Sequence, residues 1–431
     1  MFNEKKAAFY TLGCKLNFAE TSTISRQLAK SGFIKTDFNN PADIYVINTC
    51  SVTENANREC RRIIRKARKI SPSSFIVVTG CFAQLKPKEI SKIEGVDMVL
   101  GANDKFNLPK LLTSLEKNKL TKVHGCEINE LDYFSSYSLN DRTRSFLKIQ
   151  DGCNYPCTYC TIPLARGKSR SDSIENIIKN AQDIAEKGIK EIVLTGVNIG
   201  DFKYENKNFA SLINELDNID GIDRYRISSI EPNLISDKVM QAVKKSKKFM
   251  PHFHIPLQSG SDLILGKMRR RYQTKLYRKI VENISREIKN VCIGADVIVG
   301  FPGETDEEFY KTLNFIKDLP ISYLHVFSYS ERANTPATNF DHKVPKKTKA
   351  ERSKQLRILS SKLKNSFYKK YVNSKHSVLL EKDNHNGMLY GFTDNYIKIK
   401  TPFNTNICQT KQQVKLLQID ADGIMKAELT N

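Results

Sequence analysis

Short apolar runs alternate with amphipathic segments over the first 125 residues. Strand-like runs rich in Val, Ile and aromatic residues occupy 7–12, 43–49, 75–80 and 97–101. Segments with apolar residues at helical spacing occupy 20–32, 54–69 and 107–117. Strands that alternate with helices form βαβ units, whose parallel sheet is covered by helices on both faces. The pattern therefore predicts an N-terminal, doubly wound parallel α/β domain over residues 1–125.

A polar stretch, residues 126–144, follows as a predicted linker, and the alternation then starts again. Six further strands are predicted at 146–150, 191–196, 224–229, 252–256, 293–300 and 323–330. Helical spacing is found between them, at 173–188, 275–289 and 304–319. Six β/α units in succession predict a partial (β/α)6 barrel over residues 145–340, whose chemistry lies at the C-terminal ends of the strands.

The C-terminal part of the chain changes pattern twice. Apolar residues recur at helical spacing and predict a connecting helix over residues 341–373: Leu356, Leu359, Leu363, Phe367 and Tyr371. Five short apolar runs between turn residues then predict a small all-β, OB-like barrel over residues 374–431. Three aromatic residues alternate there beside two lysines, as surfaces for base stacking next to phosphate contacts require: Tyr390, Phe392, Tyr396, Lys398 and Lys400.

The charge balance indicates a polyanionic partner. The chain has 69 Lys and Arg against 47 Asp and Glu, a formal net charge of +22. Residues 341–375 alone hold twelve of the basic residues against two acidic ones, so we expect this protein to bind nucleic acid. No apolar run approaches the roughly 18 residues of a membrane span, and the run at 7–12 is too short and too strand-like for a secretion signal. We expect a cytoplasmic protein without a membrane partner, whose ten cysteines are metal ligands or buried side chains.

Three cysteines each follow a predicted strand of the N-terminal domain. Cys14, Cys50 and Cys81 come directly after the first, second and third of these strands. Because the carboxyl ends of parallel strands share one edge of a sheet, we expect these thiols to meet at a common metal site. Four other cysteines have no partner at ligand spacing and are expected to be structural: Cys60, Cys126, Cys292 and Cys408.

A second group of three cysteines follows the first strand of the predicted barrel. The stretch DGCNYPCTYC places Cys153, Cys157 and Cys160 in a CxxxCxxC spacing. A structural zinc site takes four ligands, and iron–sulfur clusters normally take four thiolates. Three thiolates leave one metal position open, which is what a catalytic site requires.

The spacing, with an aromatic residue before the last cysteine, resembles the signature of radical S-adenosylmethionine enzymes. Further motifs resemble the methylthiotransferases of that superfamily: TLGCKLNFAET (11–21), INTCSVT (47–53), VVTGCFAQ (77–84), YCTIPLARG (159–167), LTGVNIGDF (194–202), HIPLQSGS (254–261) and ADVIVGFPGET (295–305). TLGCKLN and TGVNIGDF are most similar to the branch that acts on N6-threonylcarbamoyladenosine at position 37 of tRNA. Together these motifs extend the resemblance over essentially the whole chain.

The resemblance implies two [4Fe–4S] clusters, one held by Cys153, Cys157 and Cys160 and an auxiliary one held by Cys14, Cys50 and Cys81. S-adenosylmethionine then has two roles, as methyl donor and as the source of a 5′-deoxyadenosyl radical. Expected contacts to this cofactor come from strand ends and from the cysteine loop: Tyr159, Thr195, Gly196, Val197, Asn198, Ser229, Glu231 and Gln258. Expected partners are the tRNA anticodon stem-loop, gripped by a TRAM-type C-terminal barrel, a small-protein electron donor and an unknown sulfur donor.

Several alternatives stay open at this point. Other branches of the family modify N6-isopentenyladenosine-37 of tRNA or an aspartate of a ribosomal protein, and the basic surplus argues against the latter. A protein of another class, a non-catalytic RNA-binding protein stabilised by zinc, leaves Cys14, Cys50 and Cys81 without a role. Gly300 and Gly303 fit either a ligand-binding turn or a turn before a helix capped by Thr305 and Glu308. His252 and His254 fit either the core or the site.

Overall fold

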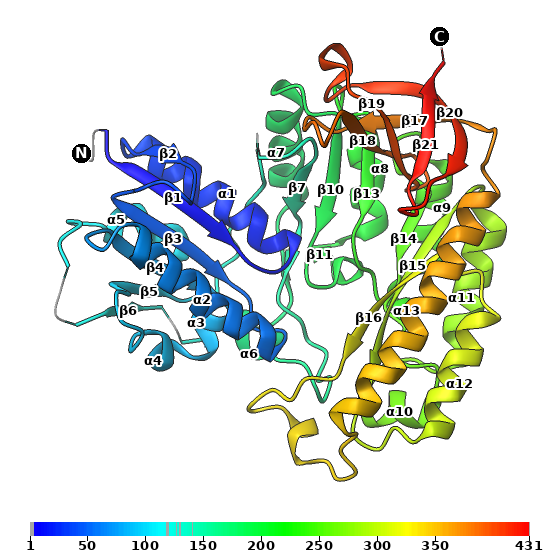
Figure 1. Cartoon of the computed structure of the whole chain (residues 1–431), viewed down its shortest axis with the longest axis horizontal. Coiled ribbons are helices and arrows are strands. Elements are labelled where there is room, and N and C mark those ends of the chain that lie inside the picture. The colour runs from blue at the N-terminus through cyan, green and yellow to red at the C-terminus, as the bar shows by residue number, and fades with distance from the viewer. Residues whose placement is uncertain (1–3, 118–119, 126, 129–130, 140, 431) are drawn as a thin grey trace.

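A computed structural model describes residues 4–117, 120–125, 127–128, 131–139 and 141–430. Figure 1 shows an N-terminal α/β part, a central half-open barrel and a small C-terminal β-barrel. The two larger parts stand side by side, and the small barrel sits at one end of the central strands (Figure 1).

The N-terminal part is a six-stranded parallel sheet in the order β2-β1-β3-β4-β5-β6. Its strands are β1 (Lys6–Thr11), β2 (Ile34–Thr36), β3 (Ile44–Thr49), β4 (Phe75–Gly80), β5 (Met98–Leu100) and β6 (Lys122–His124). Its helices are α1 (Lys15–Lys30), α2 (Glu54–Ile70), α3 (Cys81–Leu85), α4 (Pro87–Ile90) and α5 (Leu108–Leu111). One face of the sheet packs on Ile63 and Ile64 of α2, and the other packs on Ile24 and Leu28 of α1. The doubly wound fold is confirmed.

Two details of this domain differ from the sequence-based expectation. The edge strands β2 and β6 have three residues each, too few to give a recognisable run. The helix expected over 107–117 ends at Leu111, because Leu112 turns to an extended conformation. Leu112 and Leu115 still pack into the core there, so burial is achieved without the helix.

The central part has six parallel strands, as expected. They are β7 (Ser145–Lys148), β10 (Glu191–Thr195), β13 (Arg224–Ile227), β14 (His252–His254), β15 (Cys292–Val299) and β16 (Tyr323–Ser328). They form two three-stranded sheets, and the bridges Tyr225↔Phe249 and Ser229↔His254 join the sheets between β13 and β14. The helices of this part are α6 (Ile162–Arg166), α7 (Ile174–Glu186), α8 (Phe209–Asp217), α9 (Asp237–Lys245), α10 (Asp262–Lys267), α11 (Thr274–Glu287) and α12 (Asp306–Lys317). Between β7 and α6, the short β8 (Gln150–Asp151) pairs with β9 (Arg170–Ser171).

The basic helix α13 (Lys346–Lys369) joins the central part to the C-terminal barrel. Leu356, Leu359 and Phe367 are buried and Leu363 packs against the central core, so the predicted apolar stripe is confirmed for these four. Tyr371 lies beyond the end of the helix and packs against the core of the C-terminal barrel. The strands β17 (Lys375–Leu380), β18 (Met388–Thr393), β19 (Lys398–Pro402), β20 (Lys411–Ile419) and β21 (Met425–Leu429) close a five-stranded barrel. Among the described residues, no helix is both long and apolar enough to cross a lipid bilayer.

Buried arginines fasten the C-terminal barrel to the central strands. Arg226 on β13 donates to the carbonyl oxygens of Thr393 (2.7 Å) and Asp394 (2.9 Å). Arg224 donates to the Phe392 carbonyl at 3.1 Å. Glu191, fully buried on β10, balances both guanidinium groups. These bonds satisfy main-chain acceptors of the small barrel with side chains of the larger one.

Candidate active site

The loop between β8 and α6 carries Cys153, Cys157 and Cys160. Backbone N–H groups point at two of the sulfurs, from Tyr155 to Cys153 Sγ at 3.4 Å and from Ile162 to Cys160 Sγ at 3.5 Å. Burial raises the pKa of Cys153 to about 11 and that of Cys160 to about 12. Thiols with such pKa values are protonated at neutral pH, and a metal that binds them displaces the proton.

Arg270 approaches the middle cysteine of this loop. Its Nη1 lies 3.2 Å from Cys157 Sγ and 3.5 Å from the Tyr159 hydroxyl, and its other nitrogen pairs with Glu231. Burial raises the pKa of Cys157, and the charge of Arg270 opposes that shift. Tyr159 packs its ring against Phe301, so its side chain helps to hold the loop. Arg270 was missed by the sequence analysis because it lies in no motif and is 113 residues from Cys157.

The three N-terminal cysteines lie at one edge of the sheet, as the strand-end argument predicts. Cys14 precedes α1, Cys50 follows β3 and Cys81 opens α3, while β1, β3 and β4 are neighbouring strands. A Cβ atom on Gly13 would stand 2.9 Å from Cys50 Sγ, and Gly13 has a φ of +98°, so only glycine fits beside this thiol. Burial, together with the nearby Cys81 and Cys14, raises the pKa of Cys50 to about 12.

Arg166 connects this group of thiols to the central barrel. It lies against Cys81 and donates to Asn17 Oδ1 at 2.7 Å, and Asn17 in turn contacts Cys14 Sγ at 3.9 Å. Its Nη1 also bonds Glu20 at 3.0 Å and Asp151 at 2.9 Å. One guanidinium group therefore contacts residues of both larger domains and lies beside the auxiliary cysteines.

Glu20 is the centre of a buried charge network between the two larger domains. Its carboxylate, 0% exposed, pairs with Lys105 (2.6 Å), Arg166 (3.0 Å) and Lys148 (3.7 Å). Burial alone would raise the pKa of Glu20, but the charges of Arg166, Lys105 and Lys148 outweigh it and lower the pKa to about 2. The folded chain thus stabilises the ionised form of Glu20 relative to the unfolded chain, and this ionisation contributes to the free energy of unfolding.

We expect Glu20→Gln to lower the free energy of unfolding by about 3 kcal/mol at pH 7, because three buried cations lose their shared partner. The wild-type advantage is fully present above pH 4.5, the usual pKa of the carboxyl, and declines as the pH falls towards 2, by about 1.4 kcal/mol per pH unit. Urea titrations of both chains, prepared alike at pH 7 and pH 3, measure this difference. The matched control is Glu59→Gln, which breaks an exposed pair with Arg62 and should cost under about 1 kcal/mol.

The second barrel strand ends in the segment Thr195 to Asn198, which Gln150 holds in place. Its Oε1 accepts from the backbone N–H of Val197 (3.0 Å) and of Asn198 (2.9 Å). A Cβ on Gly196 would stand 2.9 Å from the same oxygen, so Gly196 permits this close approach. Gln150 was also missed by the sequence analysis, since an amide inside a strand has no local signature.

Two predicted cofactor contacts present buried polar atoms without a partner among the described residues. These atoms are Asn198 Nδ2 and Gln258 Oε1. Gln258 has a φ of +63°, a strained conformation for a residue other than glycine. Buried polar atoms are normally hydrogen-bonded, so both atoms fit contacts to a polar ligand. The other two predicted contacts in this region are already engaged, Ser229 with His254 Nδ1 at 2.7 Å and Glu231 with Arg270.

The structure distinguishes between the two interpretations of the histidines and glycines near the barrel strands. His252 is core, because it bonds the Tyr323 hydroxyl at 2.9 Å and stacks on Tyr396 at 3.9 Å. His254, on the same face of β14, is half-buried and pairs with Asp296 at 2.8 Å. Gly300 and Gly303 form the turn before α12, and the Thr305 side chain caps that helix by accepting from the Glu308 N–H at 3.3 Å. The Glu308 side chain bonds Ser261 and Lys311 instead of completing a capping box.

The C-terminal aromatic residues have different surroundings. Tyr396 stacks on His252 and Phe392, and Phe392 lies under Arg144, so both rings face the central domain. Lys400 is paired with Asp420 and Asp422. Lys398 Nζ lies 4.9 Å from the centre of the Tyr390 ring, and contact of this pair with nucleic acid stays a prediction. Of the cysteines expected to be structural, Cys60 and Cys292 are buried, Cys408 is half-buried, and Cys126 lies outside the described residues.

The spacing of the thiols discriminates between kinds of metal site. Within the described residues, three ligand atoms from His, Cys, Asp or Glu lie within 4.8 Å of one another at His254, Asp296 and His325 only. Neither cysteine group is as compact as thiolates around one zinc ion, where each Zn–S bond is about 2.3 Å long. An iron–sulfur cluster distributes its thiolates over separate irons. Three spaced thiols on each side therefore fit two iron–sulfur clusters better than two zinc ions.

Comparisons with known proteins agree with this geometry. The model of the radical SAM superfamily matches residues 147–316, and that of uncharacterized protein family UPF0004 matches residues 6–101. The chain is 40% identical to threonylcarbamoyladenosine tRNA methylthiotransferase MtaB of Bacillus subtilis, over 95% of this chain and 93% of that protein. The corresponding protein of Thermotoga maritima is 35% identical over 98% and 96%.

Two further matches concern the substrate of the related tRNA methylthiotransferases and the fold. The tRNA-2-methylthio-N(6)-dimethylallyladenosine synthase of Clostridium botulinum is 34% identical over 86% of this chain and 85% of that protein. The radical S-adenosylmethionine methyltransferase TsrM of Kitasatospora setae superposes with a TM-score of 0.58 at 13% identity, covering 78% of this chain and 77% of that one. At that identity the likeness shows a shared fold.

Proposed function

Because this chain belongs to the radical S-adenosylmethionine methylthiotransferase family, we propose that it inserts a methylthio group at C2 of N6-threonylcarbamoyladenosine at position 37 of tRNA. The observation that carries this substrate is the 40% identity, over 95% of the chain, to the Bacillus subtilis enzyme of that name. The net charge of +22 supports an RNA substrate over a ribosomal protein.

In this proposal each group of three cysteines holds one [4Fe–4S] cluster, Cys153, Cys157 and Cys160 in the barrel and Cys14, Cys50 and Cys81 in the N-terminal domain. When bound, the clusters and S-adenosylmethionine supply the electron, the radical and the methyl group that no side chain can provide. The three-ligand set leaves an open coordination position, as a substrate-binding metal site requires. A small protein remains our predicted electron donor.

The remaining residues bind and orient. Gln150 fixes the backbone of Val197 and Asn198 by two hydrogen bonds. These residues form part of the proposed binding site of S-adenosylmethionine. Arg270 places a positive charge beside Cys157, which favours its thiolate. The Glu20 network fixes the two domains relative to each other, so that both cysteine groups keep one orientation towards the substrate between them. Predicted domain boundaries at 125, 145, 341 and 374 fit this division of roles.

The test is nucleoside mass spectrometry of tRNA from a strain that lacks the gene. We expect 2-methylthio-N6-threonylcarbamoyladenosine to vanish, N6-threonylcarbamoyladenosine to accumulate, and the wild-type gene to reverse both changes. Loss of the methylthiolated isopentenyladenosine instead would assign the chain to the other tRNA branch. Protein reconstituted under nitrogen should carry about eight irons, and a protein that carries zinc alone would contradict the proposal.

A further inference from the structure

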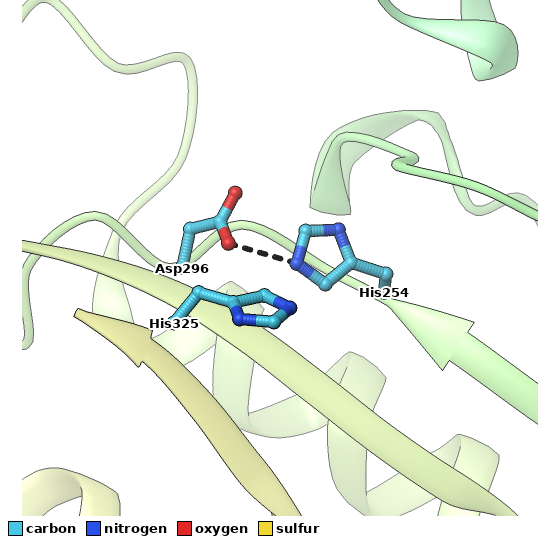
Figure 2. A group of neighbouring side chains, drawn as sticks. All are labelled: His254, Asp296 and His325. Atoms are coloured by element: carbon cyan, nitrogen blue, oxygen red, sulfur yellow. Dashed lines mark hydrogen bonds and ion pairs between the residues drawn. The ribbon is translucent and has the colours of Figure 1, made fainter. Parts of the chain in front are cut away.

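Three polar side chains of the barrel interior form a cluster that the proposed chemistry does not use. His254 ends β14, Asp296 lies on β15 and His325 on β16. Asp296 and His325 are direct partners in the parallel register, and His254 pairs with Gly294, two residues before Asp296. All three side chains therefore leave the sheet on the same face. Figure 2 shows the two rings and the carboxylate gathered in one place, with ligand atoms within 4.8 Å of one another.

The cluster has both satisfied and free hydrogen-bonding positions. His254 is engaged at both nitrogens, with Asp296 Oδ1 at 2.8 Å and with the Ser229 hydroxyl at 2.7 Å. The dashed line in Figure 2 joins His254 and Asp296, while the second oxygen of Asp296 and the His325 ring have no hydrogen bond to any described residue. The His325 residue is exposed. One carboxylate oxygen and one exposed imidazole are thus left to bind a ligand.

A cation of the N-terminal domain lies on the helix that packs against the central strands. Lys15 follows Cys14 directly, is exposed, and forms no ion pair within the part of the chain that the structure describes. Its charge acts on Cys14 and Asp296 and on the His325 ring. Lys15 shares one face of α1 with Phe18 and Ala19, and these two side chains pack with Phe146 and Val193 of the central strands, so Lys15 leaves the helix on the side of the barrel, next to Cys14.

We propose that Lys15, Asp296 and His325 form the subsite that binds the threonylcarbamoyl arm of the substrate base. This inference rests on the proposed function. The arm carries a carboxylate, a hydroxyl group and urea N–H groups, whereas an isopentenyl arm is a hydrocarbon. Lys15 matches the carboxylate, the free Asp296 oxygen accepts from an N–H or the hydroxyl, and His325 supplies a further polar contact.

This subsite also explains discrimination between the two arms. A hydrocarbon arm would cover the ammonium, the carboxylate and the imidazole without giving any of them a partner. Leaving charged groups desolvated and unpaired is costly, so a site built for polar groups rejects an analogue that lacks them. Rejection of the isopentenyl arm thus follows from the same three side chains that bind the polar one.

Two histidines and one carboxylate also form iron sites in other proteins. Here Lys15, on the face of α1 that packs on the central strands, adds a positive charge that would repel a divalent cation. Both nitrogens of His254 are moreover already hydrogen-bonded. A polar organic group with a negative charge suits these surroundings better than a metal ion.

The test compares anaerobic binding of three anticodon stem-loop RNAs by the cluster-loaded protein. Position 37 carries N6-threonylcarbamoyladenosine, its carboxamide analogue, or adenosine. We expect the wild type to bind the carboxylate form about tenfold or more tightly than the carboxamide, as a charged hydrogen bond contributes. Lys15→Gln should abolish that preference, and His325→Phe and Asp296→Asn should each reduce the preference for the modified base over adenosine. In turnover assays Lys15→Gln should raise KM more than it lowers kcat.

The matched control is Lys30→Gln, which removes the same charge at the other end of α1, far from the cluster. It should weaken all three RNAs equally and keep the preference. Iron content and circular dichroism verify that each variant is folded.

If the wild type methylthiolates the threonylcarbamoyl base but Lys15→Gln keeps the carboxylate preference, the subsite is overturned and the function stands. A wild type that acts only on the isopentenyl base overturns both. Binding of one equivalent of Mn²⁺ or Zn²⁺ that His325→Phe abolishes would assign the cluster to a cation and overturn the subsite.

Discussion

Cys157→Ala is expected to abolish cleavage of S-adenosylmethionine and to remove about four of the roughly eight irons. Cys157 is the one buried residue among the three loop cysteines, and Arg270 contacts its sulfur at 3.2 Å. With two thiolates left, the barrel cluster has too few protein ligands to be retained. Iron analysis and chromatography of 5′-deoxyadenosine, under nitrogen with dithionite as reductant, measure both effects.

The control for this substitution is Cys408→Ser in the C-terminal barrel. Cys408 is half-buried, and its thiol contacts only the Asn404 carbonyl, at 3.4 Å, among the described hydrogen bonds. It should keep full iron content and cleavage activity. A Cys157→Ala protein that still yields 5′-deoxyadenosine at the wild-type rate would refute the assignment of the barrel cluster.

Cys81→Ala should separate the two halves of the reaction. We expect methylthiolated nucleoside to fall to background while 5′-deoxyadenosine still forms, because the substitution changes the N-terminal cysteine group and leaves the barrel loop intact. Arg166 keeps its bonds to Asn17, Glu20 and Asp151, so the domains stay together. About four irons should be lost. Parallel assays of the two products on one tRNA preparation test this.

Cys60→Ala provides the comparison in the same domain. Cys60 is fully buried on α2, and its thiol donates to the Cys50 carbonyl at 3.5 Å. We expect both products and all of the iron to be preserved, with a stability loss of about 1 kcal/mol for the removed sulfur. Equal damage from Cys60→Ala and Cys81→Ala would mean that packing, and not iron binding, explains the phenotype.

The sequence predicts the elements of this fold well because burial leaves a periodic signal. The run IYVINT of β3 is buried at every residue, as a strand covered on both faces must be. Strand ends then locate Cys14, Cys50 and Cys81 at one edge without any knowledge of their distances. Three-residue edge strands have no such signal, and β2 and β6 were missed for that reason.

The residues that connect the domains could not be predicted in this way. Glu20 and Lys105 look like ordinary surface charges in the sequence, yet both are buried, because partners from distant segments neutralise them. The same holds for Arg270, whose contact with Cys157 depends on how two loops meet. Phe392 and Tyr396 were expected to offer stacking surfaces to RNA, and they pack instead against residues of the central domain.

The attachment of the small C-terminal barrel limits how RNA can be presented to the reaction. Arg224 and Arg226 hold its main chain at three consecutive carbonyl groups, from Phe392 to Asp394. Because these hydrogen bonds hold the main chain of the small barrel, they prevent it from rotating relative to the central strands. The distance between the RNA-binding barrel and the reaction site is then fixed. A stem-loop of altered length would therefore place the wrong nucleotide at that site.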